Sequence, residues 1–199
     1  ACSEHCTEGM VISTRSEKVM EARRFVLDLL MSNHREHCFS CPQNGSCKLQ
    51  DYCMEYGVEY TSYDSGKRVN APKDTSNPFF EYNPQLCMCR RCVRICEELQ
   101  CRNVISLKDR SFDTIITTAY GRPWSETTCE SCGNCVSHCP TGALSAKDHK
   151  KYRSWEVRKV RTTCPHCATG CQMDLLVRDN RIVGAEPADG PSNHNPLCA

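Results

Sequence analysis

Closely spaced cysteine runs are the feature that most constrains how this chain can fold. The 199 residues include 19 cysteines, and 15 of these fall into four runs. The runs are His34-x3-Cys38-x2-Cys41-x5-Cys47, Cys87-x-Cys89-x2-Cys92-x3-Cys96, Cys129-x2-Cys132-x2-Cys135-x3-Cys139, and Cys164-x2-Cys167-x3-Cys171 with the distant Cys198. Soft thiolate ligands at such spacings are typical of iron–sulfur clusters. Several clusters in one small protein indicate a path for electrons.

Composition argues against the alternative of a disulfide scaffold. A cysteine content near one residue in ten would suit a small secreted domain. However, the number of cysteines is odd, and no secretory signal precedes the first of them. No apolar run approaches the roughly 20 residues needed to span a bilayer. The sequence therefore predicts a protein of the reducing cytoplasm, without a membrane span, whose cysteines bind metal.

Charge and hydrophobic content point the same way. A formal net charge of +1 gives no indication of a nucleic-acid partner. Hydrophobic residues, with cysteine included, make up only 39% of the chain, so an ordinary core would be thin. Bonds between thiolates and metal can organise such a chain, and metal binding then contributes directly to folding. We therefore expect the metal-free protein to be largely unfolded.

The two central runs, within residues 83–146, form an internal repeat of the bacterial ferredoxin kind. In two-cluster ferredoxins the last cysteine of each run binds the other cluster. This rule predicts Cys87, Cys89, Cys92 and Cys139 as ligands of a second cluster, and Cys129, Cys132, Cys135 and Cys96 as ligands of a third. The later run fits the ferredoxin pattern fully, because Pro140 follows its last cysteine.

The earlier central run is irregular. One residue separates Cys87 from Cys89, where the usual spacing has two. The simplest interpretation is a shortened loop in which Cys87 still binds the cluster. Two alternatives stay open, namely a cluster with a missing ligand and a labile iron, or Cys101 as a substitute ligand.

The first run places a histidine before three cysteines. It predicts His34, Cys38, Cys41 and Cys47 as the ligands of a first cluster. A neutral imidazole in place of a thiolate changes the charge of the cluster and shifts its reduction potential. Cys53 or His37 could instead be the fourth ligand, but the offset of His34 from the cysteines matches a known arrangement.

The last run has only three neighbouring cysteines. Cys198 is the only cysteine that follows them, so the predicted ligands of a fourth cluster are Cys164, Cys167, Cys171 and Cys198. His166 lies between these ligands and is expected at the surface. Among the remaining cysteines, we expect Cys53 and Cys101 to pack near clusters. Cys2 and Cys6 have no assigned role.

Local patterns divide the chain into modules. Helices are expected from the cap at Ser16 to Asn33 and from Cys47 to Tyr56, with Gly57 as the stop. A β-like stretch is expected at Phe112 to Thr118, and a hairpin joins Gln172 to Arg178 with Arg181 to Val183. The predicted modules are 1–57 (helical), 58–82 (linker), 83–146 (two-cluster ferredoxin), 147–161 (a basic, solvated linker) and 162–199 (single cluster).

Four aromatic residues are assigned to packing. We expect Trp124 and Trp155 to be packing anchors rather than electron relays. Phe79 and Phe80 are expected to cover a cluster from solvent.

This order of sites resembles the N-terminal part of molybdenum- or tungsten-dependent formate dehydrogenase catalytic subunits. The matching segments are 8–11, 32–34, 49–51, 76–80, 91–94 and 139–144. The stretch from Cys164 to Cys198 resembles the domain that opens the bis-pterin oxidoreductases. The first two-thirds are also similar to the large iron–sulfur subunit of respiratory complex I and to iron-only hydrogenases. The resemblance implies an α+β fold of small modules organised by clusters, ending in a β-hairpin cluster domain.

Two departures from that family shape the functional expectation. The other ligands of a preceding [2Fe-2S] domain, whose last ligand would fall near Cys2 or Cys6, are absent. The pterin-binding body is also absent, and the chain stops at Ala199 without the lysine that bridges to the pterin. Ala1 is what removal of an initiator methionine would leave, which suits a natural start.

We therefore expect a stand-alone, non-catalytic electron-transfer subunit with four [4Fe-4S] clusters and no pterin, flavin or nicotinamide. Its expected partners are a formate dehydrogenase and a hydrogenase or flavoprotein that handles nicotinamide. Two alternatives remain, namely a fragment of a formate dehydrogenase catalytic subunit and a zinc-binding interaction module.

Overall fold

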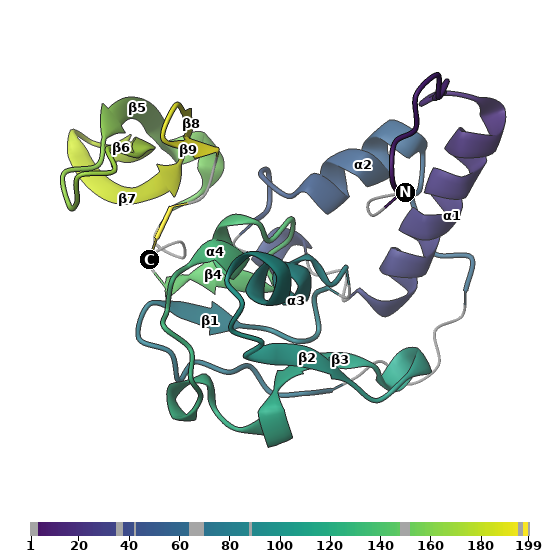
Figure 1. Ribbon diagram of the computed structural model, residues 1–199, viewed down its shortest axis with the longest axis horizontal. Helices are drawn as coiled ribbons and strands as arrows, with labels where there is room; N and C mark the ends of the chain where they lie inside the picture. The colour runs from purple at the N-terminus through teal and green to yellow at the C-terminus, as the bar shows by residue number, and fades with distance from the viewer. Residues whose placement is uncertain are drawn as a thin grey trace.

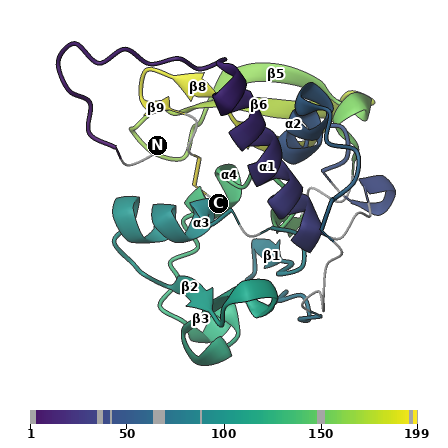
Figure 2. The same ribbon diagram turned by 90° about the vertical axis from the view of Figure 1, so that its right-hand side faces the viewer.

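The protein folds into three neighbouring parts, as seen in a computed structural model (Figure 1). The structure describes residues 4–34, 38–41, 43–63, 70–87, 89–147, 152–194 and 197–198. A helical part contains α1 and α2, a central part contains β1 to β4, and a C-terminal sheet contains β5 to β9. Figure 2 shows α1 and the C-terminal strands at one end of the molecule and the β2–β3 hairpin at the other.

Two packed helices form the first part. α1 (Glu17–Asn33) begins where the Ser16 hydroxyl accepts a hydrogen bond from the Val19 amide at 3.4 Å. α2 (Lys48–Tyr56) ends at Gly57, whose φ of 67° is the left-handed conformation that glycine favours. Both helices lie where the sequence predicts them. They pack through a small apolar core of Leu27, Leu49 and Tyr56.

The central part is built from two antiparallel strand pairs and two short helices. β1 (Phe80–Tyr82) pairs with β4 (Leu144–Ala146), and β2 (Ile105–Lys108) pairs with β3 (Ile115–Thr118). The helices are α3 (Arg91–Arg94) and α4 (Asn134–Ser137). Two boundaries differ from expectation, since β1 lies inside the predicted linker and β3 starts three residues after Phe112.

An internal repeat is visible in the backbone of this central part. In both halves a residue in the left-handed conformation directly precedes the short helix, with φ of 62° at Arg90 and 75° at Gly133. Each helix then carries the third cysteine of its run, Cys92 or Cys135. The backbone therefore makes the same tight turn before the third cysteine of each run, although only the later run has a glycine at this position.

The core of the central part is aromatic and includes cysteines. Phe80, Tyr82 and Trp124 are buried together with Cys92 and Cys135. The rings of Phe80 and Trp124 meet edge to face, with centroids 5.0 Å apart. The cysteines are thus part of the hydrophobic core rather than an addition to its surface, and Trp124 is the packing residue that the sequence predicts.

The C-terminal part is a three-stranded antiparallel sheet in the order β5-β6-β7. It comprises β5 (Arg158–Thr163), β6 (Gln172–Arg178) and β7 (Arg181–Pro187), with a small pair of β8 (Asp189–Gly190) and β9 (Asn193–His194) beside it. The predicted hairpin is confirmed, and Asp179 and Asn180 both have positive φ, as its tight turn requires. β5 was not anticipated, because its only large apolar residue is Val160.

Short helical turns link these elements. They are η1 (Cys38–Ser40), η2 (Ile95–Leu99, a π turn), η3 (Ser111–Asp113), η4 (Ala119–Gly121), η5 (Trp124–Glu126) and η7 (Ser154–Glu156). Across the described ranges, every helix is too short or too polar to cross a lipid bilayer.

Candidate metal centres

One cavity in the central part gathers cysteines from both halves of the repeat. Its lining includes the four thiols of Cys87, Cys89, Cys92 and Cys139, which are the predicted ligands of the second cluster. Tyr82, Ile116 and Leu144 close the cavity with apolar surface. The structure therefore brings three thiols from one run together with the last thiol of the other.

Backbone amides point at the sulfurs of this cavity. The Cys89 amide donates to Cys87 Sγ at 3.3 Å, and the Leu144 amide donates to Cys139 Sγ at 3.4 Å. In the regular run the same contact is made by the Ser131 amide, which donates to Cys129 Sγ at 3.4 Å. In both runs, therefore, the sulfur of the first cysteine accepts a hydrogen bond from the amide two residues later, although the earlier run is one residue shorter. Cys87 lines the cavity, whereas its possible substitute Cys101 is exposed.

The thiols of the second site interact with one another. A hydrogen bond from the Cys87 thiol stabilises the thiolate of Cys89, which lowers the pKa of Cys89 to about 6 and raises that of Cys87. Burial raises the pKa of Cys92 to about 12 and also raises that of Cys139. Four thiolates this close together and away from water would be destabilised by burial and by mutual repulsion. A cationic metal group would compensate their charge.

A second cavity holds the complementary set of cysteines. Cys96, Cys129, Cys132 and Cys135 all line it, and they are the predicted ligands of the third cluster. Phe80 and Trp124 form part of its wall. The last cysteine of each run therefore lies with the first three of the other run, which is the arrangement of two-cluster ferredoxins.

The two cavities lie close enough for their thiols to influence each other. Burial is the main reason that the pKa of Cys135 is raised, and the neighbouring charge of Cys92 adds to it. Cys92 and Cys135 sit on α3 and α4, which pack against each other. The repeat therefore places its two sites side by side.

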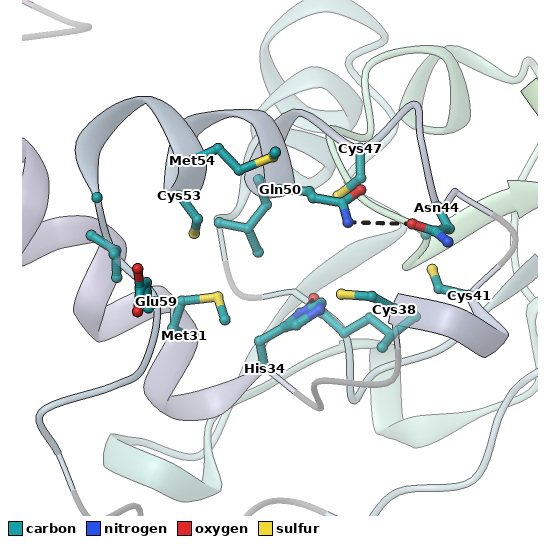
Figure 3. A pocket seen from close by; sticks show the side chains of 15 residues that line it. Met31, His34, Cys38, Cys41, Asn44, Cys47, Gln50, Cys53, Met54 and Glu59 are labelled. Carbon is teal, nitrogen blue, oxygen red and sulfur yellow. Dashed lines mark hydrogen bonds between the residues drawn. The ribbon is translucent and has the colours of Figure 1, made fainter.

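The first predicted site lies in a pocket of about 450 Å³ between the two helices of the helical part. His34, Cys38, Cys41 and Cys47 all line this pocket and point toward a common space (Figure 3). Cys53 on α2 lines the same pocket. His37, the other possible ligand, lies outside the described residues.

The imidazole of His34 is oriented by a backbone carbonyl. Its Nδ1 lies 2.5 Å from the Leu86 carbonyl oxygen. A carbonyl can only accept, so Nδ1 carries the proton, and the Nε2 lone pair is then the one that can bind iron. Histidine ligands of metals are commonly fixed in this way by a hydrogen bond at the other nitrogen. Leu86 directly precedes Cys87 of the second site.

The thiols of the first site are held by α2 and by a neighbouring loop. Cys47 directly precedes the first residue of α2, and burial raises its pKa although the amides of Gln50 and Leu49 favour its thiolate. Cys47 Sγ also lies 3.7 Å from the Pro140 carbonyl oxygen. A Cβ added to Gly142 would come within 3.0 Å of Cys41 Sγ. The loop after Cys139 therefore packs directly against the first site.

The fourth predicted set is more open. The Cys164 amide donates to the Cys171 carbonyl at 2.8 Å, which closes the loop between β5 and β6. Cys167 at the tip of that loop is exposed, and a hydrogen bond with Thr169 lowers its pKa. Cys198 is also exposed, next to Leu197, whose carbonyl accepts from Ser137 of α4. His166 is exposed, as expected.

Several other sequence expectations are resolved by the structure. Cys53 lines the first site as expected, whereas Cys101 is exposed rather than packed, although its neighbours Gln100 and Arg102 line the third site. Phe80 covers the third site, whereas Phe79 is 53% exposed. Trp155 is 64% exposed and packs against the loop at Gly45. Cys6 is exposed, and Cys2 lies outside the described residues.

Two residues near the first site were missed by sequence analysis. Gly142 makes the close approach to Cys41, and Arg153 donates hydrogen bonds to the loop of Cys38 and Cys41. Gly142 could have been suspected from its place just after Cys139-Pro140. Arg153 gave no signal, because a basic residue within a basic run is usually solvated.

The donor sets fit iron–sulfur cubanes. Every cysteine among the described residues is a free thiol, and two cavities each present four of them. A cubane needs four soft ligands around a centre larger than one ion. Within the described ranges, no three His, Cys, Asp or Glu side chains form a group that could hold a single metal ion.

Comparison with protein families identifies three cluster domains. Residues 23–62 match the NADH-ubiquinone oxidoreductase-G iron-sulfur binding region, and residues 122–145 match the 4Fe-4S binding domain. Residues 157–199 match the molybdopterin oxidoreductase Fe4S4 domain. The three matched ranges cover the helical part, the later cysteine run and the C-terminal sheet.

Relatives extend this similarity along the chain. An NADH-quinone oxidoreductase subunit of Rhizobium meliloti is 38% identical over 186 residues, which cover 92% of this chain and 22% of the relative. The NADPH-Fe(3+) oxidoreductase subunit alpha of Geobacter sulfurreducens is 34% identical over 201 residues, covering 100% of this chain and 23% of the relative. This chain thus spans about a quarter of the length of these relatives.

A solved structure shares the fold. It is the NAD+-reducing [NiFe]-hydrogenase in the H2-reduced state, with a TM-score of 0.63 and 24% identity over 73% of this chain and 62% of that chain. Other relatives include an NADP-reducing hydrogenase subunit of Solidesulfovibrio fructosivorans and a protein of Staphylococcus haemolyticus named as a formate dehydrogenase. The chain therefore contains 4Fe-4S domains of the NADH-ubiquinone oxidoreductase-G and molybdopterin oxidoreductase types, and its homologues include subunits of NADH-quinone oxidoreductases and hydrogenases and proteins named as formate dehydrogenases.

Proposed function

We propose that this chain is an electron-transfer subunit that holds four [4Fe-4S] clusters and relays electrons between redox partners. The observation that carries the proposal is the pair of crossed four-cysteine cavities in the central part. The proposed ligand sets are His34, Cys38, Cys41 and Cys47; Cys87, Cys89, Cys92 and Cys139; Cys129, Cys132, Cys135 and Cys96; and Cys164, Cys167, Cys171 and Cys198. When bound, the clusters supply one-electron redox chemistry.

The protein around these sites performs three tasks. Cysteine and histidine side chains fix where each site lies. Amides that donate to Cys87, Cys129 and Cys139 partly neutralise sulfur charge, which favours the more negative reduced state. Phe80 and Trp124 exclude water from the third site, so burial also sets its potential.

Short covalent and hydrogen-bonded links join the first three proposed sites. His34 contacts the Leu86 carbonyl, one residue before Cys87, which links the first site to the second. Pro140, which follows Cys139, accepts from the Lys48 amide at 3.1 Å and lies beside Cys47. Cys92 and Cys135 connect the second site to the third through the packing of α3 on α4.

The partners are proposed from the chemistry of the relatives. The names of those relatives combine nicotinamide oxidation or reduction, hydrogenase and formate dehydrogenase activities. We propose that this chain carries electrons among subunits of such a complex, with formate dehydrogenase and a hydrogenase or flavoprotein as neighbours. In this role it does not catalyse the reaction of either partner and binds no pterin, flavin or nicotinamide.

Iron and acid-labile sulfide per chain test the number of clusters. Four cubanes give about 16 of each. A value near 12 would mean that one of the four sites holds no cluster. The site of Cys87, with its shortened spacing, and the exposed fourth site would then be examined first. A colourless protein without sulfide would support the zinc-binding alternative and overturn the proposal.

Substitution of His34 tests the first ligand set. His34→Cys should retain the iron content and shift one midpoint potential to a lower value, because a thiolate adds negative charge to the cluster. His166→Gln is the matched control, because His166 is an exposed histidine beside another set, and it should leave all potentials unchanged. Unchanged midpoints and EPR signals in His34→Cys would show that His34 is not a ligand.

The fragment alternative has its own test. The length of the native gene product and the molybdenum or tungsten content of the purified complex separate a relay subunit from part of a catalytic subunit. A longer polypeptide that binds a pterin would replace the proposed relay role with an enzymatic one.

A further inference from the structure

A short segment joins the C-terminal sheet to the loop of the first site. We call residues 152–156 the bridging segment; it lies within the basic stretch that the sequence analysis expected to be solvated. Its first residue, Tyr152, is 5% exposed and packs on β7, where a Cβ added to Gly184 would come within 3.0 Å of the Tyr152 hydroxyl. Trp155 packs on Gly45, where an added Cβ would come within 2.9 Å of its ring. The segment therefore contacts both parts of the molecule.

Arg153 makes the polar contact with the first site. Its Nη1 donates to the Cys41 carbonyl oxygen at 2.5 Å, and its Nη2 donates to the Phe39 carbonyl oxygen at 3.4 Å. Cys41 is a proposed ligand, and Phe39 follows the proposed ligand Cys38. A guanidinium keeps its charge at all ordinary pH values and can donate to two acceptors from one plane. One side chain thus holds the backbone of the proposed ligand Cys41 and of Phe39, and places a fixed positive charge beside the site.

A carboxylate fastens the bridging segment to the sheet. Glu156 Oε2 accepts from the Arg153 amide at 3.1 Å and from Arg178 Nη1 of β6 at 2.9 Å. These contacts run from the sheet through Glu156 to the backbone of Arg153, whose side chain reaches the first site. The position of the Cys38–Cys41 loop is therefore tied to the C-terminal sheet, more than 100 residues later in the chain.

We propose that Arg153 is a positioning residue that sets the geometry and raises the reduction potential of the first site. The inference rests on the proposed function, because it takes the loop of Cys38 and Cys41 to hold a cluster. Reduction adds negative charge to a cluster, and a nearby guanidinium stabilises that charge. Removal of the guanidinium therefore lowers the potential of the first site and leaves the other sites unchanged.

The test uses the intact, iron-loaded protein with three variants. Arg153→Met removes the charge at similar length, Arg153→Lys keeps the charge without the forked contact, and Arg158→Met is a matched control on β5, five residues further along the same basic stretch. The readouts are EPR-monitored midpoint potentials and hydrogen exchange of amides in residues 38–47. We expect Arg153→Met to lower one midpoint and to speed exchange by about tenfold or more. Arg153→Lys should keep the potential near that of the unaltered protein with intermediate exchange, and Arg158→Met should change neither.

The outcomes separate this inference from the function on which it rests. Loss of about four irons per chain in Arg153→Met would overturn the predicted shift in potential, because a merely structural residue gives the same loss. Faster exchange without a shift in potential would show a merely structural residue and overturn the inference, as would variants that match the unaltered protein. If the unaltered protein contains no cluster at Cys38 and Cys41, the proposed function fails at this site and the inference falls with it.

Discussion

The central part and the C-terminal part present the same type of proposed cluster ligand, the cysteine thiol, in opposite surroundings. In the central part, Cys92 and Cys135 are 8% and 9% exposed and belong to the aromatic core. In the C-terminal part, Cys167 and Cys198 are exposed, and the Leu197 carbonyl accepts a hydrogen bond from Ser137 of α4. The electrostatics differ accordingly, because burial raises the pKa of Cys92 while Thr169 lowers that of Cys167.

This difference shows that a metal site can serve a fold in two ways. Where the cysteines are core residues, the cluster replaces part of the apolar interior, and metal binding is coupled to folding. Where the cysteines lie in an exposed loop, strand pairing and the buried Leu176 can hold the sheet apart from the metal. The predictions below test this contrast.

Iron removal should produce the largest effect. We expect chelation of all iron to abolish hydrogen-exchange protection in β1 and β4, because their core loses the clusters that compensate its buried thiols. Amides of β6 should retain measurable protection, because the hydrogen bonds of β5 and β7 flank it on both sides. Mass-spectrometric hydrogen exchange of the metal-free and loaded proteins measures both regions. Equal loss of exchange protection in the two regions would contradict the proposed difference between them.

Substitution of single cysteines should distinguish the role of the metal in the two regions more clearly. Cys135→Ala and Cys167→Ala should each lose about four irons per chain. The former should lower the free energy of unfolding of the central part by at least about 4 kcal/mol, the range associated with loss of a structural metal. The latter should change it by less than about 0.5 kcal/mol, because Cys167 lies in an exposed loop and is not part of the central core. Denaturant unfolding followed through exchange of β1 and β4 amides provides the measurement.

The pH dependence of cluster retention should also differ. In the iron-free protein, burial raises the pKa of Cys92 to about 12 and also raises those of Cys135 and Cys139. These thiols are protonated at neutral pH, so iron must displace their protons, and falling pH favours the iron-free form. Between about pH 8 and about pH 6 the central part should lose iron to a chelator more readily, with a smaller change at Cys167, whose pKa is lowered.

Iron and sulfide assays resolve the two regions in matched variants. Cys135→Ala leaves one central site together with the helical and C-terminal sites, and Cys167→Ala leaves the two central sites and the helical site. If the iron retained by Cys167→Ala were independent of pH, proton displacement from buried thiols would not govern retention.

The smallest effect concerns the repeat within the central part. Arg90 and Gly133 occupy equivalent left-handed positions, but only glycine adopts that conformation without a Cβ penalty. Arg90→Gly should therefore stabilise the loaded protein by about 1 kcal/mol, and Gly133→Ala should destabilise it by about the same amount. Thermal unfolding of both variants at one protein concentration measures these changes in stability. A destabilising Arg90→Gly would show that the arginine side chain contributes a contact that outweighs its backbone strain.

Local patterns in the sequence located much of the secondary structure. Ser16 and Gly57 predicted the start of α1 and the end of α2, because a capping hydroxyl and a left-handed glycine act within one turn of the chain. The β6–β7 hairpin followed from Asp179-Asn180 for the same reason. β1 and β5 were missed, because their pairing partners lie elsewhere in the chain and their own residues carry little local signal.

The cysteine spacing by itself determined the kind of chemistry and the three-ligand loops, because those loops close over a few residues. Through the rule of two-cluster ferredoxins it also predicted the crossed fourth cysteines of the central part. Only the tertiary structure decided how Leu86 orients His34 and which thiols are buried or exposed. These features depend on segments that are distant in sequence and are brought together by packing. Arg153 is the extreme case, because its role depends on carbonyl oxygens more than 100 residues away.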